Sequence, residues 1–332
     1  MRNILCVTLI ALLGGCTSTS VTEKYQDKRN DIINVKDKVI EFETGNVLIG
    51  SVSRLYMSNK CLLIADHKSV DKQIHIFNKN DFSYLTSIGN FGEGPEEITV
   101  MGCLAIDEAH HQLYVSDHAK QKIFSYDMDS VMVDSLYKPQ VKTAMNETLF
   151  PSEYQYINDT LSIAVLIKPT STSTFNQFLG RWNMSTGEMI PMKYTHPDIQ
   201  KKRITFAASE KAGIYVECYT RHDLMTICSL DGELLYNIYG PDWDGGNGNK
   251  LQSFGTVMIG NDKIFVSYCG EDYARDSFPT KILVFDLEGN YLKTLETGYK
   301  ISDCCYDSFN NRIILSLNDV VQFAYLDIDG II

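Results

Sequence analysis

The sequence lacks the short motifs by which many enzymes and metal proteins are recognised. It contains no CxxC pair for a structural zinc ion, no Gly-x-Ser-x-Gly elbow, no His-Glu-x-x-His pair and no dinucleotide-binding fingerprint. Beyond its N-terminal segment it also has no apolar run long enough to cross a bilayer. Catalysis by residues that are distant in sequence is not excluded by these absences, but no motif supports it.

Positive charge is scarce as well. The chain has 30 Lys and Arg against 42 Asp and Glu, a net charge of −12; without residues 1–15, which hold a single Arg, the net charge is −13. A chain this acidic is repelled by nucleic acid and by anionic lipid head groups. We therefore expect no nucleic-acid partner, and contact with a membrane only through an anchor.

The N-terminus has the form of a secretory signal peptide. One positive charge precedes an apolar run from Ile4 to Leu13, which is too short to span a bilayer as a helix. Two glycines and Cys16 follow, a pattern that resembles the bacterial lipoprotein box. The resemblance implies cleavage before Cys16 and a diacylated cysteine whose lipid carries the membrane affinity. The alternative is an ordinary signal peptide with an incidental cysteine.

Residues 1–15 are thus predicted to be a signal peptide, and the polar residues 16–37 a lipidated tether. Thr17, rather than an aspartate, follows the cysteine, which in Gram-negative lipoproteins favours the outer membrane. We expect a protein of the cell envelope that is anchored by lipid at the outer membrane.

The remaining cysteines do not form a disulfide framework, because their number is odd and their spacing is irregular. Most are expected to be buried thiols that act as small hydrophobic side chains. Cys218 and Cys228 flank a predicted hairpin symmetrically and are candidates for a cross-strand disulfide. The seven are Cys61, Cys103, Cys218, Cys228, Cys269, Cys304 and Cys305.

A repeat of about fifty residues determines the predicted fold. The strand-like phrases LLIAD, LYVSD, LSIAV, IYVEC, IFVSY and IILSL begin at spacings of 51, 48, 53, 50 and 49 residues. A short strand and a polar turn precede most of them, and a further strand follows; in the clearest units an Asp-Gly or Glu-Gly turn then leads to a fourth strand. Six antiparallel units of four strands, with no convincing helix between them, predict an all-β, six-bladed β-propeller.

The ends of the chain predict how the ring closes. The sixth unit stops after its third strand, at YLDIDGII, so its outermost strand is missing. Residues 38–45, KVIEFETG, form an extra strand with no unit of its own. Pairing of this strand with the sixth unit would close the ring and remove an exposed edge. The propeller is therefore predicted to span residues 38–332.

The second unit, GCLAIDEAHHQLYVSDHAKQKIFSYD, resembles an NHL repeat. Together with the preceding IGNFGEGPEEI it resembles the TolB-like six-bladed propeller lipoproteins of Gram-negative bacteria. The similarity covers nearly all of the mature chain and is close in units one, two and five. It implies an envelope-facing propeller, in most members without a defined activity, whose top face and central channel bind partners or small ligands.

The glycine-rich stretch SIGNFGEGPEEI, residues 87–98, is predicted to be a crossover between the first and second blades. A phosphate-binding loop would end in Gly-Lys-Ser/Thr and enter a helix, whereas here glutamates precede a β-branched run. A sharply turning crossover is sufficient reason for glycine and proline. The carboxylates Glu93, Glu96 and Glu97 are candidates to contact a ligand at the channel mouth.

Further candidate ligand-binding residues lie in loops that are expected to surround the same mouth. Residues 242–249, DWDGGNGN, contain oxygen ligands, but their spacing is not that of an EF-hand calcium loop. We therefore expect no cofactor; the alternative is that this loop binds calcium or another divalent metal. Three loops place histidine beside aspartate, which suits either a metal or proton-transfer site or ordinary turn chemistry. The candidates are Asp66, His67, Asp117, His118, His222, Asp223, the exposed aromatic Trp243, and the cluster Glu271, Asp272, Tyr273 and Arg275.

Together these features predict an envelope-anchored lipoprotein whose propeller is a non-catalytic binding platform for a protein or glycan partner. Two alternatives stay open. One is a metal-dependent propeller enzyme of the lactonase or lyase type that acts at the channel mouth. The other is a structural accessory of an envelope complex that binds no small ligand.

Overall fold

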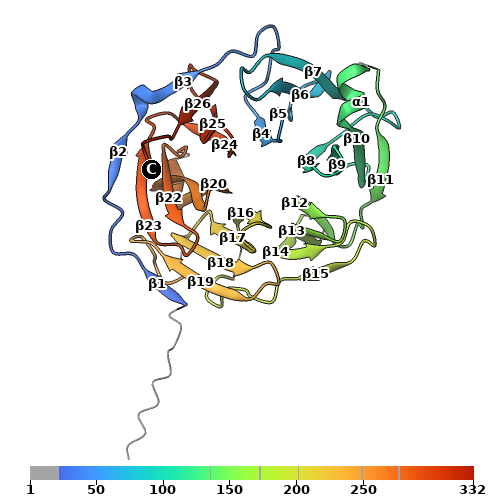
Figure 1. The fold of residues 1–332 in the computed structure, drawn as a ribbon. Coiled ribbons are helices and arrows are strands. Elements are labelled where there is room, and N and C mark those ends of the chain that lie inside the picture. The colour runs from blue at the N-terminus through green and yellow to red at the C-terminus, as the bar shows by residue number, and fades with distance from the viewer. Residues whose placement is uncertain (1–21, 135, 172, 201, 248–249, 276) are drawn as a thin grey trace, which may run out of the picture.

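The computed structural model describes residues 22–134, 136–171, 173–200, 202–247, 250–275 and 277–332. The predicted signal peptide and Cys16 lie outside these residues. Six antiparallel sheets stand in a ring (Figure 1), which confirms the six-bladed propeller. No helix in the described ranges is long and apolar enough to cross a membrane.

Blades one to three follow one another along the chain, each running from its inner to its outer strand. They consist of β4 (Ser53–Met57), β5 (Cys61–Asp66), β6 (Lys72–Asn78) and β7 (Tyr84–Asn90); β8 (Met101–Asp107), β9 (Gln112–Asp117), β10 (Lys122–Asp127) and β11 (Gln140–Ala144); and β12 (Phe150–Asn158), β13 (Leu161–Pro169), β14 (Phe175–Trp182) and β15 (Met189–Pro191).

Blades four to six repeat this order. They consist of β16 (Ile204–Ser209), β17 (Ile214–Tyr219), β18 (Leu224–Ser229) and β19 (Leu234–Tyr239); β20 (Leu251–Gly260), β21 (Lys263–Asp272), η2 (Tyr273–Arg275), β22 (Lys281–Asp286) and β23 (Tyr291–Glu296); and β24 (Ile301–Asp307), β25 (Arg312–Leu317) and β26 (Phe323–Asp327). The six phrases that define the sequence repeat all fall in the second strand of a blade, as predicted.

The N-terminal strap, residues 22–41, runs along the outer edges of blades four, five and six (Figure 1). It contains β1 (Glu23–Tyr25), β2 (Ile32–Asn34), η1 (Lys36–Lys38) and β3 (Val39–Glu41). β3 pairs antiparallel with β26 and supplies the missing outer strand of blade six, which confirms the predicted closure. β1 and β2 add parallel fifth strands to blades four and five. The prediction of a free tether over 16–37 is therefore wrong from residue 22 onward.

A short helix, α1 (Met128–Val133), interrupts blade two between β10 and β11, where the sequence predicted only strands. The Asp127 carboxylate caps it by accepting a hydrogen bond from the Ser130 amide at 2.7 Å. The helical sequence MDSVMV, which follows this cap, is too short to show a helical period, so the pattern alone did not reveal it.

The core of the ring consists of six apolar clusters, one between each pair of neighbouring blades. The strand β5 shows how the sequence produces this arrangement, since Leu63 packs against blade two while Leu62 and Ile64 pack against blade six. Alternate residues of a strand point to opposite faces, so a strand with neighbours on both sides is apolar throughout. This explains the continuous apolar runs of the repeat.

The cysteines follow the same alternation. All seven described cysteines are buried free thiols, so the proposed Cys218–Cys228 disulfide is wrong. The ladder places Cys218 opposite Met225 and Cys228 opposite Tyr215, and the two thiols pack into different inter-blade clusters on opposite faces of blade four.

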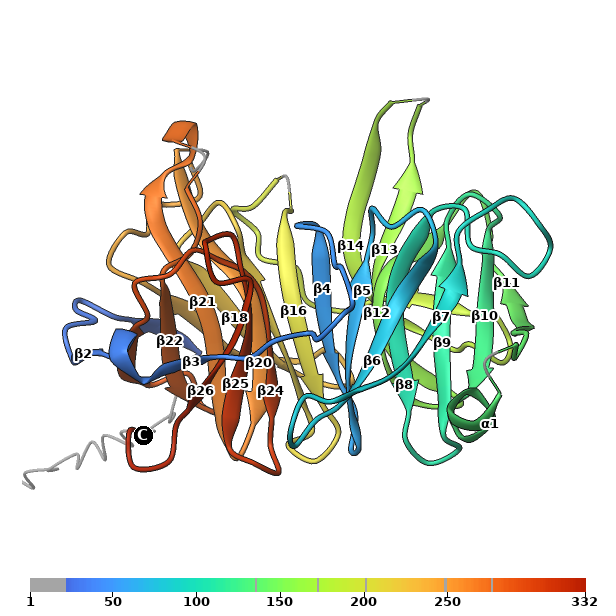
Figure 2. The same ribbon diagram turned by 90° about the horizontal axis from the view of Figure 1, so that it is seen from above.

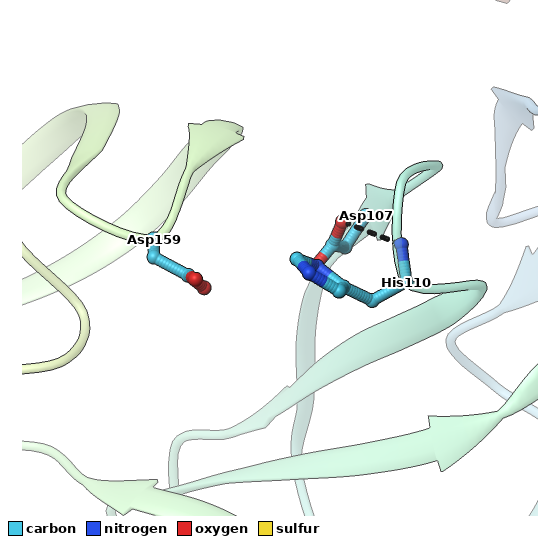
Figure 3. A group of neighbouring side chains, drawn as sticks. All are labelled: Asp107, His110 and Asp159. Atoms are coloured by element: carbon cyan, nitrogen blue, oxygen red, sulfur yellow. Dashed lines mark hydrogen bonds and ion pairs between the residues drawn. The ribbon is translucent and has the colours of Figure 1, made fainter.

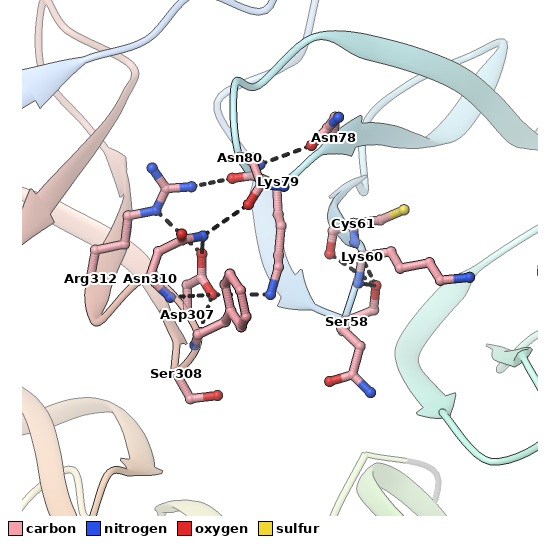
Figure 4. Close-up of polar contacts among 12 residues, drawn as sticks. Ser58, Lys60, Cys61, Asn78, Lys79, Asn80, Asp307, Ser308, Asn310 and Arg312 are labelled. Carbon is pink, nitrogen blue, oxygen red and sulfur yellow. Dashed lines mark hydrogen bonds and ion pairs between the residues drawn. The ribbon is translucent and has the colours of Figure 1, made fainter.

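Polar groups lock the seam between blades six and one (Figure 4). The buried carboxylate of Asp307 accepts from Lys79 Nζ at 3.3 Å and from Arg312 Nε at 3.3 Å, while Asn310 Nδ2 donates to it at 2.7 Å. Burial alone would raise the pKa of Asp307, but the hydrogen bonds from Asn310 and the charge of Lys79 hold it below its usual range. The first-to-second-strand turn of blade six is thereby tied to the third-to-fourth-strand turn of blade one.

Arg29 anchors the strap between β1 and β2. Its Nη1 lies 2.7 Å from Asp223 Oδ1, and the two side chains are 6% and 0% exposed. Its guanidinium lies 5.6 to 5.7 Å from the ring centres of Phe254, Tyr268 and Phe285. The strap thus inserts a cation into the seam between blades four and five, where a buried carboxylate and aromatic faces receive it.

We expect Arg29→Ala to lower the free energy of unfolding by about 3 kcal/mol, because it leaves the buried Asp223 carboxylate without its cation. Adding Asp223→Asn should recover part of this loss by removing the stranded charge. The control is Arg181→Ala, which breaks the exposed Arg181–Asp231 pair and should change stability by less than about 1 kcal/mol. Urea denaturation measures all three variants. Equal losses for Arg29→Ala and Arg181→Ala would show that the strap is not held by this pair.

Candidate functional site

The propeller has two unlike faces. The crossover face carries the loops between second and third strands, such as residues 67–71, and the blade-to-blade connections, such as 91–100. The hairpin face carries the turns between first and second strands and between third and fourth strands. Two hairpins rise above the crossover face (Figure 2): the one between β13 and β14, and the one between β21 and β22, which carries η2 and pairs with the start of β20. Phe175 and Tyr273, near their tips, are 57% and 48% exposed.

A central channel opens between the faces and has a volume of about 1760 Å³. The inner strands of all six blades line it: β4, β8, β12, β16, β20 and β24. Arg54 on blade one and Glu153 on blade three meet there, with Nη2 and Oε1 2.8 Å apart, and their side chains are 45% and 40% exposed. This charge pair of the channel is therefore accessible from solvent.

Asp303 on β24 is the third charged group of the middle of the channel. It accepts hydrogen bonds from Thr256 Oγ1 of blade five at 2.7 Å and from the Leu55 amide of blade one at 2.8 Å. Burial raises the pKa of Asp303, a shift that these two hydrogen bonds and the nearby Arg54 only partly oppose. The Asp303 carboxyl thus links blade six to blade five on one side and to blade one on the other.

Other polar side chains continue these bridges around the wall. Gln155 Oε1 of blade three accepts from the Ala208 amide of blade four at 2.6 Å, and Thr205 Oγ1 of blade four donates to the Gly255 carbonyl of blade five at 2.6 Å. These hydrogen bonds link neighbouring blades along a channel wall to which both polar and apolar residues contribute.

Two of the predicted histidines, His67 and His118, line the channel near its crossover end. His67 Nδ1 lies 3.3 Å from the Met101 carbonyl, and the His118 ring covers the position that a side chain on Gly102 would occupy. Both Nε2 atoms are buried without a hydrogen-bond partner. Burial, with the charge of Arg54, lowers the pKa of each imidazole, so both are neutral near pH 7.

The aspartates beside these histidines serve the turns. Asp66 accepts from the Gly50 and Lys68 amides at 2.7 and 2.9 Å, and Asp117 accepts from the Thr99 amide at 2.8 Å and the Ala119 amide at 3.0 Å. Both are buried and neither lines the channel. The turn interpretation therefore holds for both aspartates.

The predicted residues of blade four lie away from the channel. His222 is buried against Tyr219 and Trp243, and Asp223 is the partner of Arg29. Trp243 packs partly buried against Tyr239, with ring centres 5.0 Å apart, so its prediction as an exposed contact is wrong. The sequence places these residues in the right loop but cannot show that the strap covers the seam beside them.

The blade-five cluster stands on the raised hairpin and not on the channel wall. Glu271 pairs with Arg275 at 2.9 Å, Asp272 accepts from the Ala274 amide at 2.9 Å, and Tyr273 stacks under the guanidinium of Arg221. This exposed group belongs to the crossover face, where a macromolecular partner would meet it.

Residues 87–90 of the glycine-rich stretch belong to β7, and residues 91–98 form the predicted crossover, which is held by hydrogen bonds to nearby residues. The Glu97 side chain accepts from the Gly94 amide at 2.8 Å, and Lys120 Nζ donates to the Gly94 and Glu97 carbonyls at 2.6 and 2.5 Å. Glu96 pairs with Lys138 at 2.7 Å. Glu93, Glu96 and Glu97 do not line the channel, so their predicted place at its mouth is wrong.

Sequence reasoning missed the residues that dominate the channel, Arg54, Glu153 and Asp303. A signal was present, because each is the only charged residue in a short segment that is otherwise uncharged: SRLYM, SEYQY and ISDCC. Period-2 alternation puts such a residue opposite the apolar face, and in an inner strand this direction is the channel.

A group on the hairpin face has the elements of a metal site. Asp107, His110 and Asp159 come within 4.8 Å of one another between blades two and three (Figure 3), the sole such trio in the part of the chain that the structure describes. A cavity of about 390 Å³ adjoins His110 and Asp159. Asp107 accepts from His110 Nδ1 at 2.8 Å, which raises the pKa of His110.

Blade six offers a direct comparison for this turn. There Asp307 caps the equivalent turn, with Asn310 in the place of His110 and Nδ2 donating at 2.7 Å. The Asp107–His110 contact is therefore a turn feature that recurs without a histidine. It lies on the face opposite to the one where a metal was considered from sequence.

Comparisons with known proteins agree with this architecture. The family model DUF5128, described as a 6-bladed beta-propeller, matches residues 17–174, slightly less than half of the chain. The chain is a six-bladed β-propeller. No curated protein matches it.

Solved structures share this propeller at low sequence identity. A Bacteroides fragilis protein classed as exported is 14% identical, with a TM-score of 0.57 over 89% of this chain and 88% of that one. A Bacteroides vulgatus member of the DUF4221 family is 11% identical, with a TM-score of 0.59 over 90% and 98%. A luciferin-regenerating enzyme is 8% identical, with a TM-score of 0.56 over 86% and 94%. At such identities the likeness extends to the fold alone.

We expect Lys120→Met to release the glycine-rich crossover of the propeller, because two short hydrogen bonds to its carbonyls are lost. The loss of stability should be about 1 to 3 kcal/mol, with faster amide exchange over residues 92–98 by hydrogen–deuterium exchange. Lys138→Met, which removes an exposed partner of Glu96, is the control and should leave that exchange unchanged. Unchanged exchange in Lys120→Met would contradict the role of Lys120.

The melting temperature should fall as the pH is lowered from 7 to 5.5. Burial lowers the folded-state pKa of the histidines His67, His75, His118, His196 and His222. The unfolded chain takes up their protons near pH 6.5 while the folded chain does not, so acid favours unfolding. His118→Gln should flatten the dependence of melting temperature on pH. His110→Gln should make it steeper, because the hydrogen bond to Asp107 raises the pKa of His110 and its protonation opposes the trend. A profile unaffected by His118→Gln would refute this assignment.

Proposed function

We propose that this protein is an exported, lipid-anchored binding module whose propeller takes a polar ligand, such as a glycan segment, at the crossover end of its channel. The signal-peptide pattern and Cys16 support export and anchoring, as does the likeness to a protein classed as exported. The single observation that carries the binding role is the half-exposed Arg54–Glu153 pair within a channel of about 1760 Å³.

The chemistry of the channel favours a neutral ligand rich in hydroxyl groups. Arg54 offers several N–H donors and Glu153 offers carboxylate acceptors side by side, an arrangement that suits vicinal hydroxyls. Tyr56 and Gln155 add polar groups along the same wall. An anionic ligand would instead meet Glu153 and Asp303, and a strongly cationic one would meet Arg54.

The enzyme alternative has less support. Within the described ranges, no trio of metal-ligand side chains gathers at the crossover end of the channel, and His67 and His118 keep their Nε2 atoms buried. The three-residue group that does occur lies on the hairpin face and repeats a turn found elsewhere in the ring.

We expect screening of the mature chain against neutral oligosaccharides to reveal a ligand that raises the melting temperature. For that ligand, Arg54→Ala should weaken binding at least tenfold, about 1.4 kcal/mol, in isothermal titration calorimetry. The matched control is Arg181→Ala, which removes an exposed arginine on the outer part of blade three and should bind normally.

Two outcomes would contradict this proposal. A ligand whose affinity is unaffected by Arg54→Ala does not bind in the channel. A melting temperature that drops in chelator and is restored by zinc or calcium, together with hydrolytic activity, would favour the metal-dependent enzyme.

A further inference from the structure

The way the strap joins blade four fixes where the lipid anchor leaves the ring. The Asn237 amide donates to the Thr22 carbonyl at 2.7 Å, and Glu23 accepts from Asn237 Nδ2 at 3.0 Å and from the Tyr239 hydroxyl at 2.5 Å. Tyr25 stacks on Tyr239 with ring centres 4.5 Å apart. The point of attachment is therefore a firm part of the propeller and not a loose end.

The direction of β1 shows from which side the chain arrives. β19 is the outer strand of blade four and runs from the hairpin face toward the crossover face. β1 pairs with it in parallel, with Glu23 opposite Asn237 and Tyr25 opposite Tyr239. The described chain therefore begins, at Thr22, on the side of the hairpin face.

The raised hairpin of blade five shows how far the crossover face extends beyond the level at which the strap joins blade four. Asn237 and Thr294 are each the fourth residue of the outer strand of their blade, and Thr294 is level with Val266 through the ladder of blade five. From Val266 to Asp272, β21 continues for six residues, or about 20 Å, toward the crossover side. Measured along β21, the strand thus ends about 20 Å beyond the residue that is level with Thr294.

The length of chain before Thr22 is short by comparison. Six residue steps separate Cys16 from Thr22, which reach at most about 20 Å when fully extended. For the crossover face to lie on a membrane, this segment would have to reverse its direction and extend fully past the hairpin of blade five. The hairpin side of the blade-four rim lies within easy reach.

We infer that the lipid anchor holds the propeller with the hairpin side of blade four toward the bilayer, and that the crossover face points away from the membrane. The channel end with Arg54 and Glu153, together with the raised hairpins at Phe175 and Tyr273, is then presented to ligands and partners in the aqueous compartment. This inference rests on the proposed anchoring at Cys16.

Photo-crosslinking to lipid tests this orientation in the lipidated full-length protein reconstituted in phosphatidylethanolamine–phosphatidylglycerol vesicles. p-Benzoylphenylalanine replaces either Lys211, an exposed residue in the hairpin-face turn of blade four, or Tyr273, exposed on the raised hairpin. We expect at least tenfold more phospholipid adduct at position 211 than at position 273, measured by mass spectrometry. Equal adducts, or more at position 273, would overturn the orientation.

A variant with a longer linker tests whether the short segment between Cys16 and Thr22 determines the orientation of the propeller on the membrane. Twenty Gly and Ser residues inserted between Ser20 and Val21 add a coil with a root-mean-square length of about 25 Å. The ratio of adducts should then fall toward one, and a ratio that stays at tenfold would refute control by the tether.

Incorporation of labelled lipid, with Cys16→Ala as the negative control, separates the inference from the proposal on which it rests. A protein that carries no lipid overturns both the anchor and the orientation. A lipidated protein that crosslinks through position 273 overturns the orientation alone.

Discussion

Each blade of this protein must bury both of its faces, and the rest of the structure depends on this constraint. A four-stranded sheet that is apolar on two sides is stable only between two neighbours, so the sheets must form a closed ring. The six inter-blade clusters are the result. The strap and the residue after it complete the two clusters beside blade six, since Val35 enters the one shared with blade five and Phe42 the one shared with blade one.

Because the inter-blade faces are apolar, charge lies in the channel, the turns, the outer strands and a few locked seams. At the seams the charges are paired in buried positions, as Lys79 with Asp307 and Arg29 with Asp223. In the channel the pairing is looser, and Arg54 and Glu153 remain almost half exposed. The difference separates the structural role of the seam pairs from the binding role proposed for the channel pair: a buried pair is costly to open, whereas an exposed one exchanges partners readily.

The strap connects the fold with the place of the protein in the cell. The same strands that cover the edges of blades four to six also determine where the chain leaves the ring. Arg29, Glu23 and Tyr25 fix this exit on the outer rim and on the hairpin side. The crossover face, which carries the longest hairpins and one end of the charged channel, is left free of the strap (Figure 2).

The sequence by itself determined the number of blades, the four-strand repeat and the closure by residues 39–41, because periodicity and the missing last strand are local patterns that a chain displays along its length. It also indicated the crossover within residues 87–98, although residues 87–90 belong to β7, because glycine and proline suit a sharp local turn of the backbone. Only the tertiary structure decided which polar residues meet. Arg54 and Glu153 are 99 positions apart, and Arg29 and Asp223 are 194 apart. Their contacts depend on the curvature of the ring and on the route of the strap, neither of which leaves a periodic trace in the sequence.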